Sequence, residues 1–497
     1  MLYVAVLCSA GLVLPGLRGY TAAGRSAFLF CTGLSLCYLA ALVLAAAEMA
    51  LTGGAGLREL LRPLTRLGGS RVCFLLYAAW AALSAACSEY EGVWLGLGRY
   101  EGLLFILVCV AVYWAVSSYG RWDDRLLALL GAVLFFNLIL GLLQYAGMNP
   151  LGLFPEGVDF HDAFVLYNGR FLGTLGNVDV LGGFLCLTVP LFYGAYLISG
   201  WRCALAPLAA GGVLLALADV DAAYVGLPAA LALTLPWYCR MPNALPRICR
   251  AAGTLALSLA AGGALYADRN TALCLRLSPV VLLLAALGAA ALGFGVLAGR
   301  SERLSRPGSE RLPRRLWAVL GAMAVLGVGL LYLLPISSGT LGQVHQMLHG
   351  TVDPSFGSGR VRIWDEVVHL IGQAPLLGGG PDTLVARMGF TFTRYSQETG
   401  AMIEAVVDAA HNDFLNIAVN LGLPALAFYI AGLVCWLRGV VRHRPRAAEI
   451  ILSGAAAYLV QICFTVSASG VILLFWILLA LSERDINLPN CKEDDLK

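Results

Sequence analysis

Charge is scarce in this chain. Of its 497 residues only 13% are Asp, Glu, Lys or Arg, whereas 59% are hydrophobic. Soluble globular domains carry about 25% charged residues. Apolar runs of roughly 20 residues, each long enough to cross a bilayer core, recur from end to end. The scarcity of charge therefore excludes a soluble enzyme and indicates an all-α polytopic membrane protein.

Motifs for nucleotides, metals and disulfides are also missing. The sequence has no Gly-rich P-loop, no H-E-x-x-H and no G-x-S-x-G motif, which argues against the enzyme classes that depend on them. The 14 cysteines lie singly and form no C-x-x-C pair, so we interpret them as small buried hydrophobic residues. Carboxylate pairs and histidine clusters with metal-ligand spacing are absent too. The sequence therefore predicts no metal and no cofactor.

Ionisable residues are nearly absent from the apolar runs themselves. Glu48 lies near the end of one run, and Asn137 and Gln461 are the polar groups inside others. Ion-coupled transporters usually need ionisable groups at mid-membrane. This absence argues against a proton or sodium transporter.

The apolar runs predict fourteen membrane spans. The first is interpreted as a span and not as a cleaved signal peptide, because a basic segment and a cleavage site are lacking. The predicted spans are 2–17, 26–51, 72–87, 101–117, 126–147, 178–198, 203–218, 222–238, 251–267, 277–299, 316–336, 411–437, 447–465 and 467–482. Arg-rich loops such as 299–315 alternate with less basic ones, and the positive-inside rule places the Arg-rich set in the cytoplasm. Both termini are then cytoplasmic.

Three polar segments fall on the opposite, outer face: 88–102, 149–177 and 337–410. The third is the longest. Together with His411, which follows it, this segment holds the side chains of Arg360, Arg362, Arg387, Arg394, Glu404 and Asp408. Polarity is thus concentrated where extracytoplasmic or lipid-linked substrates are met. The rest of the chain is interpreted as the scaffold that carries this segment.

Within 337–410, residues 358–375 show apolar positions at helical spacing, ended by Gly372 and Pro375. This pattern predicts a short amphipathic helix at the membrane surface. On the pattern alone, its two arginines are better explained as cations that reach lipid headgroups. The turn LLGGGPDTL that follows can hold an anion on exposed N–H groups, although an ordinary loop-to-helix turn is the more common explanation.

His411 stands where a new apolar run begins. An imidazole can take a proton from a hydroxyl near neutral pH, and Asp408 is placed to orient it, while Asn412 and Asp413 suit helix caps. Arg170 precedes a Gly-rich turn that enters another span. Each of these residues alone is more often just an interfacial polar group. Together, arginines and a histidine on one face indicate a site for a phosphorylated lipid, because guanidinium groups match pyrophosphate geometry.

Three stretches carry a resemblance to a known family. They are GRFLGTLGNVDVLGGF (169–184), SGRVRIWDEVVHLIGQAPLLGGGPDTL (358–384) and AHNDFLNIAVNLGLPALAFY (410–429). In this order they resemble the bacterial O-antigen ligase and O-antigen polymerase superfamily. RYEGLL (99–104) and LLQYAGMNPLGLFP (142–155) are similar to its Gram-positive-type members. Val178-Asp179 departs from the Pro-Asn pair common in that family, so the resemblance implies no role for Asp179.

The resemblance implies a metal-independent glycosyltransferase with a GT-C-like fold. Such enzymes pass a glycan from undecaprenyl pyrophosphate to a hydroxyl of a glycan, lipid or protein acceptor outside the cytoplasmic membrane. By motif match, Arg170 and Arg360 would bind the pyrophosphate, and His411 would act on the acceptor hydroxyl or the phosphate. Arg362, Asp408 and Asn412 would lie on the substrate side, with the choice between Arg360 and Arg362 open.

The resemblance also suggests a division of the chain. The expected parts are an N-terminal transmembrane bundle (1–336), a ligase-like core (337–437), C-terminal transmembrane helices (438–482) and a cytoplasmic tail (483–497). A polysaccharide polymerase of the same superfamily is the main alternative function. A flippase for lipid-linked oligosaccharide is a weaker one, because the spans lack a cationic lining, and a non-catalytic assembly protein would not need these residues on one face.

Overall fold

The structure is a computed structural model of the chain. It describes all residues except 53–55, 66, 147, 154–172, 269–270, 309–310, 336–338, 352–355, 397–400 and 488–497. Arg170, and with it most of the polar segment 149–177, therefore lies outside the described residues. The described part is mostly helical, as the sequence predicts.

The elements before residue 240 are all helices within the described ranges. They are α1 (Leu2–Leu7), α2 (Ala10–Val13), η1 (Leu14–Arg18), η2 (Tyr20–Ala22), α3 (Ala23–Leu51), α4 (Gly56–Leu61), α5 (Gly69–Ala86), α6 (Leu103–Tyr119), α7 (Arg125–Tyr145), α9 (Val178–Ser199), η3 (Arg202–Ala204), α10 (Leu205–Ala218) and α11 (Asp221–Tyr238).

The remaining elements include two short antiparallel hairpins, β1–β2 and β3–β4, which the sequence reasoning did not predict. These elements are α12 (Ala244–Ala264), β1 (Leu265–Asp268), β2 (Thr271–Leu275), α13 (Pro279–Ala298), α14 (Glu302–Ser305), α15 (Leu312–Leu333), α16 (Gly339–Leu348), α17 (Phe356–Gln373), α18 (Leu384–Arg387), β3 (Thr391–Ser396), β4 (Ala401–Val406), α19 (Asp413–Leu421), α20 (Leu423–His443), α21 (Arg446–Gln461) and α22 (Ser469–Asn487).

Seven of these helices are long and apolar enough to cross a membrane by length and composition. They are α3, α5, α7, α9, α13, α15 and α20, and shorter apolar helices accompany them. Several helices that could cross a membrane are thus confirmed, whereas the count of fourteen and the GT-C-like fold stay predictions. Large apolar side chains on α15, such as Met323, Val325 and Leu326, are exposed. Such exposure suits a helix that faces lipid.

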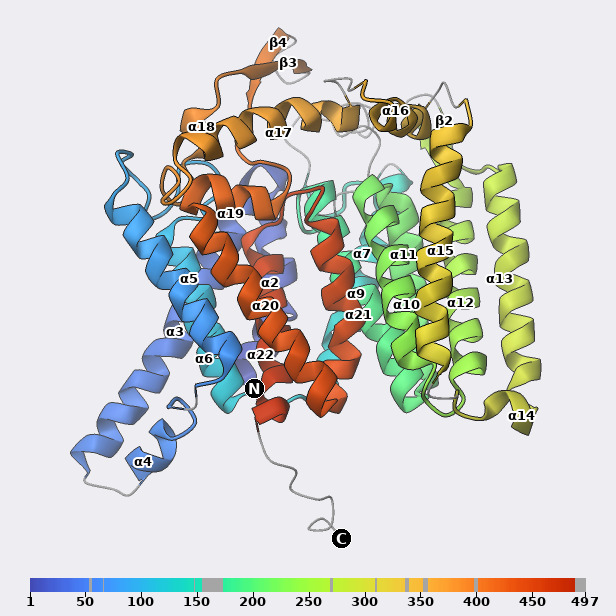
Figure 1. The fold of residues 1–497 in the computed structure, drawn as a ribbon, viewed down its shortest axis with the longest axis horizontal. Coiled ribbons are helices and arrows are strands. Elements are labelled where there is room, and N and C mark those ends of the chain that lie inside the picture. Colours follow the sequence, from blue (N-terminus) through green and yellow to red (C-terminus); the bar gives the residue numbers. More distant parts are fainter. Residues whose placement is uncertain are drawn as a thin grey trace.

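The long helices stand side by side, as Figure 1 shows. The helix α9 is almost entirely buried and packs against α10 and α21. On one side of it lie α5, α6, α20 and α22; on the other lie α12, α13 and α15 (Figure 1). The helix α17 runs across one end of the bundle, with α18, α19 and the β3–β4 hairpin beside it. We call this end the α17 end.

The predicted span 411–437 is wrong as a single helix. It is divided into α19 and α20 at Gly422, whose φ is +88°. A β-carbon at Gly422 would lie 2.0 Å from the carbonyl oxygen of Leu376, so only glycine fits there. Pro424 stands in the first turn of α20, where a missing N–H is tolerated. The membrane-crossing helix therefore begins at Leu423, and His411 precedes the short helix α19 instead.

The predicted amphipathic helix at 358–375 is confirmed as α17. Its apolar face, with Ile363, Val367 and Leu370, is buried in a small cluster that also contains Leu384 and Val419. This cluster fastens α17 onto α18 and α19. Burial of each such side chain is worth roughly 1.5–3 kcal/mol, which fixes the face that α17 turns towards the bundle.

Candidate active site at the α17 end

His411 occupies an unusual backbone position. Its φ is +49°, a left-handed conformation that costs a non-glycine residue of order 1–3 kcal/mol and is concentrated at functional sites. The neighbours of His411 hold it there. The Asn412 side chain caps α19 by accepting the N–H of Leu415 at 3.0 Å, and the N–H of Asp413 donates to the carbonyl oxygen of Ile462 at 2.9 Å.

Arg360 reaches the same site from α17. Its Nη2 lies 3.9 Å from Oδ2 of Asp179 in the first turn of α9. Asp179 is itself positioned there because Asn177 caps α9 and accepts the N–H of Asp179 at 2.8 Å. The Gln461 side chain also donates to the carbonyl oxygen of Asp179 at 3.2 Å. The residue that departs from the family pattern thus pairs with the motif arginine.

Arg362 points elsewhere. Its guanidinium lies 4.1 Å from the centre of the Phe390 ring, a cation–π contact, and the residue is exposed. Trp364, two residues after Arg362, anchors α17 beside His411, because its indole N–H donates to the carbonyl oxygen of Ala410 at 2.9 Å. Of the two arginines, Arg360 is therefore the one that approaches His411.

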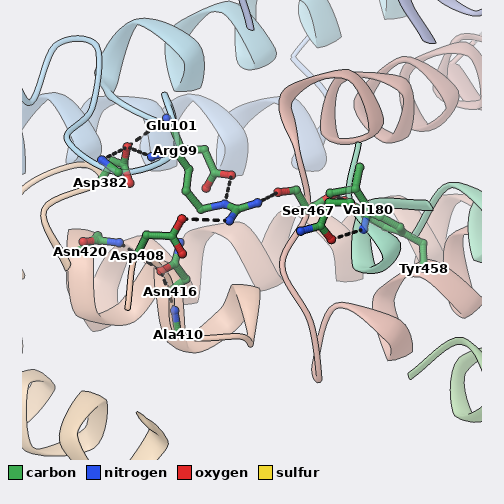
Figure 2. A network of polar contacts seen from close by, with 12 residues as sticks. Arg99, Glu101, Val180, Asp382, Asp408, Ala410, Asn416, Asn420, Tyr458 and Ser467 are labelled. Carbon is green, nitrogen blue, oxygen red and sulfur yellow. Dashed lines mark hydrogen bonds and ion pairs between the residues drawn. The ribbon is translucent and has the colours of Figure 1, made fainter. Parts of the chain in front are cut away.

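A second ion pair lies near His411, and Figure 2 shows it from close by. Nη1 of Arg99 is 3.2 Å from Oδ2 of Asp408, and Nη2 of Arg99 donates to the carbonyl oxygen of Ser467 at 3.1 Å. Nε of Arg99 lies 3.9 Å from the Glu101 carboxylate. Arg99 was not among the site residues predicted from the sequence. The signal that could have identified it is its place at the start of RYEGLL (99–104), which resembles family members.

The loop that carries Arg99 is held by Asp382. The Asp382 carboxylate accepts the N–H groups of Gly98 at 3.1 Å, Arg99 at 2.8 Å and Glu101 at 3.3 Å, as Figure 2 shows. Asp382 is 5% exposed, and its φ is +55°. We call this arrangement the Asp382 clamp. It fixes the backbone from which the Arg99 side chain extends.

The GGGPD turn (378–382), which ends at Asp382, is structural. The N–H of Gly380 donates to the carbonyl oxygen of Asn420 at 2.8 Å, and the N–H groups of Thr383 and Leu384 donate to the Asn420 side chain at 3.1 and 3.0 Å. Since these donors are occupied, the turn is an ordinary loop-to-helix connection, the explanation that the sequence favoured over an anion site.

The electrostatics of His411 follow from this setting. Burial lowers the pKa of His411, the nearby Asp179 and Asp408 carboxylates act to raise it, and Arg360 and Arg99 act to lower it. Nδ1 of the ring is buried and has no hydrogen-bond partner among the described residues. A lowered pKa keeps the ring neutral at neutral pH, so one ring nitrogen can accept a proton.

The structure thus brings three of the six predicted site residues together: His411, Arg360 and Asp408. Asn412 acts as a helix cap, Arg362 contacts Phe390, and Arg170 lies outside the described residues. Arg387 donates to the carbonyl oxygen of Val419 at 2.7 Å and thereby supports the fold. In the described ranges, no three His, Cys, Asp or Glu side chains converge so that they could hold a metal ion.

Comparison with known families gives a match in this part of the chain. Residues 271–430 match the family model described as O-antigen ligase. This match supports an assignment to the O-antigen ligase and polymerase superfamily. The ligase match contains Arg360, Asp408 and His411 but neither Arg99 nor Asp179. No curated protein matches the chain.

Proposed function

We propose that this ligase-family chain is a metal-independent, GT-C-type glycosyltransferase. It transfers a glycan from an undecaprenyl-pyrophosphate-linked donor to an acceptor hydroxyl. The observation that supports this proposal is a partly buried His411, whose pKa is lowered by burial, near two arginine–carboxylate pairs at one end of an apolar helix bundle. A base and two guanidinium groups are what this transfer needs when no metal assists.

In this proposal, Arg360 binds the donor. The 3.9 Å contact with Asp179 is too long for a hydrogen bond, so the guanidinium keeps donors for a pyrophosphate. Arginine offers two parallel N–H groups that match phosphate oxygens. Arg170 is the second proposed phosphate ligand, on the resemblance alone. Fixed positive charge stabilises the departing pyrophosphate as negative charge develops on it.

His411 then acts on the acceptor. The acceptor oxygen attacks the anomeric carbon, the bond from that carbon to the pyrophosphate oxygen breaks, and the hydroxyl proton passes to the imidazole. General-base assistance of this kind contributes roughly 10²- to 10⁴-fold. Asp408, held by Arg99, acts to raise the pKa of His411 and so stabilises the imidazolium that forms.

The proposed location is the bacterial cytoplasmic membrane, with the α17 end outside. Single cysteines on opposite sides test it in a cysteine-free background. A membrane-impermeant thiol reagent applied to intact cells should label Tyr395→Cys and leave Arg303→Cys unlabelled until the membrane is opened. The reverse pattern would overturn both the topology and the extracytoplasmic site.

The function is tested with the full chain purified into nanodiscs. The donor is an undecaprenyl-pyrophosphate-linked glycan, offered with lipid, protein or glycan acceptors. We expect a glycosylated acceptor and one released undecaprenyl pyrophosphate per transfer, and neither with His411→Ala. Elongation of the lipid-linked glycan itself would identify a polymerase. Failure of the wild type with every acceptor, or wild-type transfer by His411→Ala, would refute the proposal.

A further inference from the structure

A cavity lies inside the bundle, below α19 and between α5, α6, α20, α21 and α22. Its polar residues include Glu101, Asp413 and Asn416, and its aromatic residues include Tyr77, Tyr429 and Trp476. The centre of a water molecule can move through about 90 Å³ of it. A single buried water needs roughly 10–15 Å³ of such space, so the cavity has room for several waters or for one sugar ring.

Four polar groups of the cavity wall lack a protein partner. Within the described part of the chain, no hydrogen bond is made by the carboxyl groups of Glu101 and Asp413 or by the hydroxyls of Tyr77 and Tyr429; the nearest contact is the 3.9 Å approach of Arg99 to Glu101. None of these atoms is sealed from the cavity. A buried polar group without a partner costs about 1–3 kcal/mol, so the occupant must offer hydrogen bonds.

The two carboxyl groups indicate an uncharged occupant. Burial raises the pKa of Glu101 well above its ordinary value and raises the pKa of Asp413 to about 7. Burial therefore favours the neutral form of both groups. Any charge that they keep is negative and repels phosphate. Protonated carboxyls, phenols and the Asn416 amide all pair with hydroxyl groups, which donate and accept.

We propose that this cavity binds one neutral sugar ring of the glycan, an inference that rests on the transfer function proposed above. Its polar groups bond the ring hydroxyls, and the adjoining rings of Tyr429 and Trp476, with centres 6.0 Å apart, cover one apolar face of the sugar. Arg99 connects the cavity to the transfer site, since its guanidinium lies 3.2 Å from Asp408 and 3.9 Å from Glu101.

The first test removes two hydroxyls without opening a hole. Tyr77→Phe/Tyr429→Phe should raise the KM for one substrate roughly 10-fold, since each lost hydrogen bond weakens binding severalfold, with kcat nearly unchanged. A raised acceptor KM places the acceptor sugar in the cavity, and a raised donor KM places the donor sugar there. The control is Tyr113→Phe, because the Tyr113 hydroxyl is buried without a partner but does not line the cavity. Unchanged KM values for both substrates would overturn the proposal.

The second test does not depend on transfer. Methyl glycosides of hexoses and N-acetylhexosamines are added to the full chain without donor, and tryptophan emission is recorded. We expect a saturable change that is lost in Trp476→Phe and weakened in the double tyrosine variant. If the wild type shows no transfer but this change persists, the proposed function fails and the sugar site stands. If transfer occurs and no glycoside changes the emission, water alone fills the cavity.

Discussion

The two arginine–carboxylate pairs near His411 are built differently. Arg99 makes a 3.2 Å contact with Asp408 and a further hydrogen bond to the Ser467 carbonyl oxygen, and the Asp382 clamp fixes its loop. The Arg360 side chain is 3.9 Å from Asp179 and makes no hydrogen bond to a side chain or backbone group of the described residues. The Arg99 pair is thus preorganised, whereas the Arg360 pair can exchange its partner. This difference suggests that the Arg99 side supports the base and the Arg360 side receives the charged donor.

Replacement of His411, which lies near both arginine–carboxylate pairs, should have the largest effect on transfer. His411→Ala should reduce transfer about 10²- to 10⁴-fold because the general base is lost, while donor binding is largely retained. Product formation and binding of radiolabelled donor measure the two quantities. The thermal unfolding midpoint should stay near that of the wild type, since the side chain is only half-buried. A variant that transfers normally, or that loses donor binding as well, would contradict this assignment.

The exchangeable pair is tested by Arg360→Lys. An ammonium cannot make the two-pronged contact of a guanidinium, so we expect kcat/KM for the donor to fall about 10²-fold, the scale for one lost charge-stabilising donor. Arg362→Lys is the matched control on the same helix and should transfer at nearly the wild-type rate. Equal effects of the two substitutions would remove the distinction between the arginines.

The preorganised Arg99–Asp408 pair should affect the pH profile of kcat/KM. Asp179 and Asp408 act to raise the pKa of His411, and Arg360 and Arg99 act to lower it. A base works when deprotonated, so activity rises with pH through this pKa. Asp408→Asn should move the acidic limb of kcat/KM to lower pH, and Arg99→Met should move it to higher pH. Shifts in the same direction would show that the pair does not act through His411.

A smaller effect is expected at the cap next to His411. Asn412→Ala removes the side-chain acceptor for the N–H of Leu415, which costs about 1 kcal/mol of stability. The free energy of unfolding in detergent measures it, and Asn412→Asp should retain most of the cap. A large loss of transfer with unchanged stability would mean instead that Asn412 contacts substrate.

No effect is expected from metal removal. If guanidinium groups stabilise the pyrophosphate, activity should survive EDTA, and Arg360→Lys should stay impaired when magnesium or manganese is added. Loss of wild-type activity in EDTA, with recovery on addition of metal, would mean that a metal ion stabilises the pyrophosphate in place of Arg360.

The sequence predicted the membrane class, most helices and the location of His411, Arg360 and Asp408, because these depend on apolar runs and on one continuous segment. It missed Arg99, which lies 309 residues from Asp408. A single sequence without contacts does not show that two such distant segments meet. Asp179 departs from the family pattern, and its partner Arg360 on α17 follows only from the folded arrangement.

The division of 411–437 was missed for a different reason. Its apolar residues continue through the break, so the hydrophobic pattern alone does not reveal it. The signal was the sequence Gly422-Leu423-Pro424, in which glycine permits the positive φ and proline suits a helix start. Close packing of Gly422 against Leu376 makes the break obligatory, and that contact also depends on the fold.

The Asp382 clamp has a consequence for engineering. Asp382 lies inside the segment 271–430 that matches the ligase family, while the loop that it binds lies outside, 281 to 284 residues earlier. A chimera that imports this segment from a relative would pair a foreign turn with a native loop and leave up to three N–H groups without an acceptor. Exchange of substrate preference between relatives should therefore carry residues 96–102 along with the matched segment, as two halves of one transplantable unit.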